Sequence, residues 1–115
     1  MRVSTIALLS LFLLSACGDW SRANVEETER RGDIVAAALK NYRDRTGSYP
    51  DTLQKLVPQD LNRIPQPTVG KREWEYETWP TKDGRGYFGL KVAIRFQSKP
   101  LLQTNNEGGW SFDTK

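Results

Sequence analysis

The spacing of apolar and polar residues divides the chain into an apolar N-terminal run, one helical stretch and several stretches that alternate. Residues 6–14 are apolar apart from one serine. Residues 25–45 repeat apolar positions at intervals of three and four, which predicts an amphipathic helix. Residues 74–79 and 87–97 alternate instead, which predicts strands. This order predicts an α+β domain, in which the helix packs on a small antiparallel sheet.

The predicted helix has its apolar face in its second half. The expected stripe consists of Ile34, Val35, Ala38, Leu39 and Tyr42. The first two turns carry mostly charged residues, so we expect them to stand clear of the core. Gly32 lowers the helix propensity by about 1 kcal/mol relative to alanine, and it should mark the point where packing begins.

Glycine and proline divide the segment after the helix into short elements. Gly47 should end the helix, because glycine adopts a positive φ at little cost. Asp51 should cap a second, short helix, and Gln54 three positions later would complete a capping box. Leu56 lies on the apolar side of this helix, and Pro58 ends it.

The two alternating stretches predict a hairpin, because residues 82–86 contain an Asp-Gly turn. One register satisfies both faces. It pairs Trp79 with Tyr87 and Glu75 with Lys91 on the outer side, and Thr78 with Phe88, Tyr76 with Leu90 and Trp74 with Val92 on the inner side. The sequence therefore predicts this hairpin over a slipped one.

The C-terminal region is expected to contain one further strand. Pro100 should end the long strand of the hairpin, and Leu101 and Leu102 should begin a connection. Residues 105–109 supply turn chemistry, and residues 110–112 form the predicted last strand.

The apolar N-terminal run ends in Leu14, Ser15, Ala16 and Cys17, which resembles a bacterial lipobox. Arg2, the apolar run and the small residues correspond to the three regions of a secretory signal peptide. The run is too short to span a bilayer. An ordinary cleaved signal and a buried N-terminal helix are the alternatives.

The lipobox resemblance implies cleavage before Cys17 and a diacylglyceryl thioether on its sulfur. The predicted organisation is a signal peptide over residues 1–16, a lipidated cysteine with a short tether over 17–24, and one domain over 25–115. The partner so implied is a membrane, reached through the covalent lipid, and no other cofactor is expected. Gly18 stands where many inner-membrane lipoproteins carry aspartate, so we expect the outer membrane, on the side facing the periplasm.

Composition removes several classes of function. The chain of 115 residues contains no histidine and one cysteine, which excludes an internal disulfide and a thiolate metal cluster. A net charge of +3 with scattered basic residues predicts no nucleic-acid partner.

Glu73, Glu75 and Glu77 could be read as a glycosidase pair, but Lys91 opposite them favours a solvated, salt-bridged face. Neither a catalytic constellation nor a metal site is predicted, and the candidate oxygen ligands Asn105, Asn106, Glu107 and Asp113 lack a recognisable ligand spacing.

The region from residue 34 to residue 80 contains small residues, a glycine turn and a Tyr-Pro pair in order. The residues of this run are Ala38, Leu39, Tyr42, Gly47, Tyr49, Pro50, Leu53, Leu56, Val57, Pro58, Leu61, Ile64, Pro65 and Pro67. The run resembles pilin-like proteins, and the major pseudopilins of type II secretion in particular. It implies a helix packed on an antiparallel sheet. The long hydrophobic half-helix that assembles pilin filaments is absent, so the resemblance extends to the fold and not to filament assembly.

Aromatic residues supply the candidate partner surface. Trp79 opposite Tyr87, beside Arg85, could contact a peptide, a glycan or a protein. The alternative is that Trp79 packs under residues 65–71, and Trp20 could face solvent or rest at the membrane interface. The sequence thus favours a lipid-anchored, non-catalytic binding or scaffold module. The alternatives are a pseudopilin-related subunit or accessory of a secretion or pilus assembly, and a cell-wall-acting enzyme or inhibitor.

Overall fold

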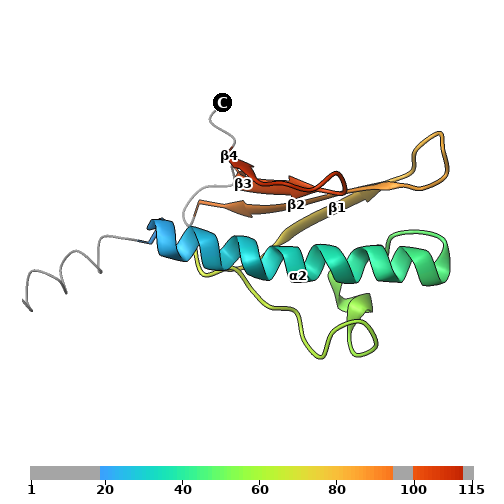
Figure 1. The fold of residues 1–115 in the computed structure, drawn as a ribbon, viewed down its shortest axis with the longest axis horizontal. Helices are drawn as coiled ribbons and strands as arrows, with labels where there is room; N and C mark the ends of the chain where they lie inside the picture. The colour runs from blue at the N-terminus through green and yellow to red at the C-terminus, as the bar shows by residue number, and fades with distance from the viewer. Residues whose placement is uncertain (1–18, 95–99, 113–115) are drawn as a thin grey trace, which may run out of the picture.

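One long helix lies along one face of a four-stranded antiparallel sheet in the computed structural model, which describes residues 19–94 and 100–112 (Figure 1). The elements in chain order are α2 (Arg22–Thr46), the 3₁₀ helix η1 (Leu53–Leu56), β1 (Glu75–Trp79), β2 (Tyr87–Ala93), β3 (Pro100–Asn105) and β4 (Ser111–Phe112). The strands follow one another across the sheet in the order β1-β2-β3-β4. The predicted α+β class is confirmed at this level.

The helix α2 begins three residues earlier than the apolar pattern indicates, because Ser21 caps it. The Ser21 hydroxyl accepts a hydrogen bond from the backbone N–H of Asn24 at 3.3 Å. Residues 22–24 are therefore helical and do not belong to a tether. At the other end Gly47 has a φ of 98°, and its N–H donates to the Arg43 carbonyl oxygen at 2.7 Å, as the sequence predicts.

The buried face of α2 contains most of the predicted stripe. Val35, Ala38 and Leu39 are buried, and Tyr42 packs partly buried against them. Ile34 was wrongly included, since its side chain is 39 % exposed. Successive residues of a helix are rotated by about 100°, so Ile34 and Val35 cannot both face the sheet directly.

The first turns of α2 do not stand clear of the core, contrary to expectation. Thr28 is fully buried, and its hydroxyl oxygen accepts a hydrogen bond from the backbone N–H of Thr68 at 3.0 Å. The Thr68 hydroxyl in turn donates to the Asn24 carbonyl oxygen at 3.0 Å. These bonds dock the polar start of the helix on residues 65–70 (Figure 1). Polar residues thus pack here through hydrogen bonds, which an apolar pattern cannot reveal.

Gly32 lies under two tryptophan rings. A Cβ atom at this position would overlap the six-membered ring of Trp110 and would lie 2.9 Å from Cη2 of Trp74. The two rings are 6.0 Å apart between centroids, and each ring nitrogen is satisfied. Trp74 Nε1 donates to the Pro65 carbonyl oxygen at 2.7 Å, and Trp110 Nε1 donates to Asp33 Oδ1 at 2.8 Å. Because Gly32 has no side chain, the two tryptophan rings can pack directly against α2 at this position.

The predicted hairpin register is confirmed from Glu75–Lys91 to Trp79–Tyr87. Its inner face buries Phe88, Leu90 and Val92 completely against the helix. The strand β2 ends at Ala93, and residues 95–97 of the longer predicted strand lie outside the described residues. The pairing of Trp74 with Val92 is not part of the ladder, because β1 begins at Glu75.

The strand β3 was missed and replaces the expected connection. Leu102 pairs with Val92 and is fully buried, and Thr104 pairs with Leu90. Thr104 occupies a core-facing position because its hydroxyl donates to the Gly109 carbonyl oxygen at 2.5 Å. The inward threonine and the leading proline conceal this strand from a pattern search.

The short helix after α2 is a single 3₁₀ turn without the predicted capping box. Thr52 is the N-cap residue, and no side chain caps the turn. Asp51 instead forms an ion pair with Lys55, with 3.2 Å between the carboxylate and Nζ. A four-residue 3₁₀ turn has few free N–H groups for a box to satisfy, so the carboxylate remains on the surface.

The ion pairs of Glu27 make the stability of the helix start dependent on pH. Hydrogen bonds from Arg30 and Arg31, both 2.8 Å long, lower the pKa of Glu27 to about 2 from an ordinary value of 4.5. A depressed carboxylate pKa gives stability that is present above the ordinary value and is lost as the pH falls toward the folded value. Arg31 also donates to the Gln66 carbonyl oxygen, so this loss should loosen the contact between α2 and the following loop.

The substitution Glu27→Gln should therefore reduce the fall in melting temperature between about pH 4.5 and pH 2. Thermal unfolding followed by circular dichroism at several pH values measures this effect. An identical acid dependence in the wild-type chain and in the variant would refute the assignment.

Candidate functional site

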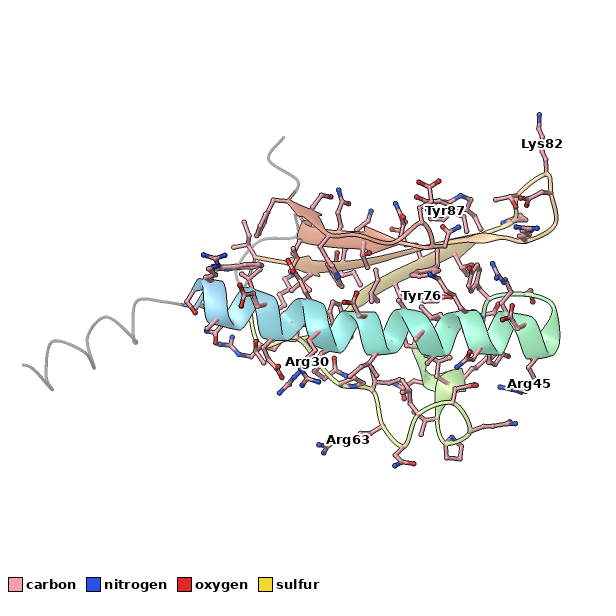
Figure 2. All side chains as sticks on the ribbon, viewed as in Figure 1. Arg30, Arg45, Arg63, Tyr76, Lys82 and Tyr87 are labelled. Atoms are coloured by element: carbon pink, nitrogen blue, oxygen red, sulfur yellow. The ribbon has the colours of Figure 1, made fainter. Side chains whose placement is uncertain are left out.

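The two faces of the sheet differ in what covers them. The inner face is covered by α2, and Tyr76 projects there and donates its hydroxyl to the Pro50 carbonyl oxygen at 2.7 Å. Tyr87 lies on the opposite, outer face (Figure 2). Residues that pair across the sheet share a face, so Trp79 projects outward beside Tyr87, its partner. The outer face is therefore where a partner could approach the sheet.

Trp79 and Tyr87 form an exposed aromatic stack. Their ring centroids are 4.6 Å apart and their planes are tilted by 32°. Trp79 is 43 % exposed, and it belongs to neither hydrophobic core cluster. The alternative expectation, that Trp79 packs under residues 65–71, is wrong. The tryptophans that contact that segment include Trp74, through its bond to Pro65, and Trp20, which packs against the cluster of Val69.

The aromatic stack forms one end of a depression that we call the outer groove. It is lined by Trp79, Tyr87, Gly89, Lys91, Gln103 and Asn105, with residues 108–111 along one side. Its volume of about 620 Å³ falls within the usual range for small-molecule sites. The groove crosses the ladders of β1, β2 and β3, whose pairing fixes the positions of its side chains.

Lys91 is the one charged side chain among the described residues that line the outer groove. Lys91 forms no ion pair with any residue that the structure describes, and none of the lining residues is acidic. Glu75 is its cross-strand partner, as predicted, but the expected salt bridge between the two side chains is not formed. Lys91 bends along its strand, and its Cε would lie 3.7 Å from a Cβ placed on Gly89. The ammonium group is thus available to a ligand.

Arg85 does not belong to the outer groove, although the sequence grouped it with Trp79 and Tyr87. It lies in the turn between β1 and β2, where its backbone N–H donates to Asp83 Oδ1 at 3.0 Å. The turn extends beyond the sheet, as the position of Lys82 shows (Figure 2). Hydrogen bonds from Thr81 and from the Arg85 backbone lower the pKa of Asp83, so its carboxylate serves to hold the turn.

The start of the described chain is fixed to the sheet side of the domain. One Asp19 carboxylate oxygen accepts from the backbone N–H of Gly70 at 3.0 Å, and the other pairs with the Arg72 guanidinium at 2.6 Å. Trp20 packs partly buried against the cluster of Val69, Val92 and Leu102, so it is not a freely exposed side chain. Leu14, Ser15, Ala16 and Cys17 lie outside the described residues.

No helix in the described ranges is both long enough and apolar enough to cross a membrane.

Groups with acid–base chemistry are dispersed over the described residues. Glu73 and Glu77 are exposed, Glu75 is half-buried, and none of the three lines the outer groove. Burial raises the pKa of Tyr76 to about 12, so its phenol keeps the proton that it donates to Pro50. No group of three or more potential metal-ligating side chains occurs within residues 19–94 and 100–112. Asn105 Oδ1 accepts from the Glu107 N–H at 2.9 Å within its own turn, and Asp113 lies outside the described residues.

No protein-family model, curated protein or solved structure matches the chain significantly. Among the described residues, the outer groove is the feature with the most specific chemistry.

Proposed function

We propose that this chain is a lipid-anchored, non-catalytic binding module of the bacterial envelope, and that the outer face of its sheet is the binding surface. The proposed anchor is a lipid on Cys17, because Leu14, Ser15 and Ala16 precede it as in a lipobox. The proposed site is the outer membrane, with the domain facing the periplasm. The proposed recognition element is the outer groove.

The exposed stack of Trp79 and Tyr87 is the observation that carries this proposal. An aromatic residue that is 43 % exposed makes little contribution to a core, whereas tryptophan and tyrosine contribute strongly to binding surfaces. The large buried side chains of β2, which are Phe88, Leu90 and Val92, lie on the other face of the sheet. A partner that covered the two rings would remove their apolar surface from water.

The length of the domain supports a module whose binding surface lies far from its proposed anchor. The helix α2 spans about 37 Å from its start at Arg22 to its end at Thr46. Tyr87 lies toward the far end of the domain from the helix start (Figure 2). Because Asp19 is bonded to Gly70 and Arg72, a lipid on Cys17 would have little slack between the membrane and the folded domain. The aromatic stack would then face away from the membrane.

A second candidate is a pseudopilin-related subunit or accessory of a secretion assembly. The favouring observation is the single long helix on an antiparallel sheet, with Tyr49 and Pro50 buried at their junction. The Tyr49 ring packs edge-on against Phe88 at 5.1 Å, and its hydroxyl accepts from Arg43 Nη1 at 2.9 Å. This arrangement supports a pilin-like fold. The absent hydrophobic half-helix makes the anchored module the first choice.

The proposal predicts that position 79 contacts a partner in living cells. A photoreactive aromatic residue placed at Trp79 in the full chain should give adducts of altered mass on irradiation. The same residue at Ile34, which is comparably exposed at 39 % but lies on α2, is the matched control and should give few. Gel mobility and mass spectrometry of the irradiated membrane fraction measure the yield. Equal yields at the two positions, or none at position 79, would refute the outer face as the binding surface.

A further inference from the structure

We propose that the outer groove binds an acidic oligosaccharide, with one sugar ring on the stack of Trp79 and Tyr87 and a carboxylate at Lys91. This inference rests on the proposed function and names the ligand of the same surface.

The aromatic end of the groove suits a sugar ring. A pyranose has one face of C–H groups, which packs on an aromatic ring, and an equatorial rim of hydroxyls, which needs hydrogen-bonding partners. Trp79 and Tyr87 offer aromatic surface on the outer side of two adjacent strands, 4.6 Å apart between centroids. Their position on paired strands holds the rings in place, so little side-chain entropy would be lost on binding.

Gly89 forms part of the floor of the groove, where it is buried next to the side chains of Trp79 and Lys91. A Cβ on Gly89 would lie 4.0 Å from Cη2 of Trp79 and 3.7 Å from Cε of Lys91, which is ordinary contact without overlap. The sheet could thus accept a larger residue here. Glycine in a strand weakens packing, and it often marks a site where a ligand approaches the backbone closely.

The other end of the groove offers polar side chains that can hydrogen-bond to the hydroxyls of a sugar rim. Gln103 pairs with Lys91 across the sheet, and Ser111 pairs with Gln103. The Gln103 amide has no hydrogen-bond partner among the described residues, and the Asn105 amide keeps its NH₂ group free while its oxygen serves the turn. Amides that donate and accept at once match hydroxyl groups well.

The charge of the lining selects an acidic ligand over a neutral one. Lys91 has no ion pair within the described chain. Glu75 pairs with Lys91 and Glu77 with Gly89 on the outer face of the sheet, but neither carboxylate lines the groove. A sugar carboxylate at this position would form a charge-assisted hydrogen bond, which is stronger than a neutral one.

An extended peptide fits this surface less well. Peptides that add to a sheet use the free N–H and C=O groups of an edge strand. The groove lies over β2 and β3, whose backbone groups are already engaged in the ladders. Recognition here has to use side chains and rings, as a saccharide does.

The test is a calorimetric titration of the full chain in detergent micelles with two saccharides of equal length. The first is a tetrasaccharide of alternating N-acetylglucosamine and N-acetylmuramic acid, and the second is chitotetraose, its neutral counterpart. We expect the acidic probe to bind about tenfold more tightly, which corresponds to one charge-assisted bond. Lys91→Gln should remove this preference, so that the acidic and the neutral probe bind with similar affinity.

Two further variants locate the site. Gly89→Leu should fill the groove and abolish binding. Trp79→Ala should weaken binding at least tenfold, whereas Ile34→Ala, an exposed apolar residue elsewhere, should leave it unchanged. Melting curves of each variant confirm that the fold persists.

Failure of the saccharide proposal differs from failure of the proposed function. No binding of either saccharide, undiminished binding by Gly89→Leu, or preference for an acidic hexapeptide would overturn the saccharide proposal. If position 79 still forms adducts in cells, the binding face stands with another ligand. If position 79 forms none, the proposed function itself fails.

Discussion

Replacing Gly32 by leucine should destabilise the domain by about 3 kcal/mol, the upper end of the usual cost of overpacking a core. The added Cβ alone would overlap the ring of Trp110 and press on Trp74, and both rings are held by hydrogen bonds to Asp33 and Pro65. The rings cannot move without breaking those bonds. For a domain of this size the melting temperature should fall by roughly 12 °C or more, measured by circular dichroism.

Ala37 provides the matched control for this prediction. It lies on the same helix and is exposed, so Ala37→Leu should change the stability by less than about 0.5 kcal/mol. The double variant Gly32→Leu with Trp110→Ala should recover part of the loss, because the first overlapping ring is removed. Equal melting temperatures for Gly32→Leu and Ala37→Leu would show that the rings do not pack on Gly32.

Replacing Gly70 by alanine should also cost about 3 kcal/mol, for two reasons that add. Gly70 has a φ of 60°, in the left-handed region that costs an L-residue roughly 1–2 kcal/mol. A Cβ would in addition overlap the Ala93 carbonyl oxygen and lie 3.0 Å from Cζ2 of Trp20. The backbone N–H of Gly70 donates to Asp19, so the change also disturbs the attachment of the first described residues.

Gly84→Ala separates the two causes. Gly84 has a φ of 79°, but no atom lies within 4 Å of a Cβ placed there. This variant should therefore lose only the stability that comes from placing an L-residue in the left-handed region, about 1–2 kcal/mol. The difference between the melting temperatures of the two variants measures the destabilisation that comes from the overlap of the added Cβ at position 70 with Ala93. A loss at Gly70 no larger than at Gly84 would contradict the described contact.

The sequence predicted those parts of the fold that depend on local pattern. The spacing of Val35, Ala38 and Leu39 located the buried face of α2, and the alternation around the Asp-Gly turn gave the hairpin register to the residue. Both follow from periodicity alone. Gly47 was also identified correctly, because its role is set by backbone sterics at a helix end.

The errors arose where polar residues take part in packing. Thr28 and Thr104 are buried because each finds a hydrogen-bond partner, and such partners leave no periodic trace. The partner of Thr28 is Thr68, 40 residues along the chain, and the partner of Thr104 is Gly109, across its own turn. Gly32 was read as a weak helix position, although it is the contact point of two tryptophans that lie more than forty residues away. These features depend on tertiary proximity.

The candidate site was predicted in part. Trp79 and Tyr87 were placed opposite each other by the register, and they form the exposed stack. Arg85 was added because it is close in sequence, but the turn carries it out of the groove. Gln103 and Asn105 were missed because they lie on β3, the strand that the sequence did not predict. Gly89 had no signature in the sequence, since only the structure shows that it lies between the side chains of Trp79 and Lys91 in the groove.

The central claim is that this domain acts from a lipid anchor on Cys17, and intact mass spectrometry of the membrane-purified chain tests it most directly. The account predicts a mature chain that begins at Cys17 and carries added acyl mass. It also predicts that the variants Cys17→Ala and Leu14→Asp carry no acyl mass. The mature form of either variant should not be detected in the membrane fraction. A chain that is cleaved elsewhere, or one that begins at Cys17 without acyl mass, would contradict the account.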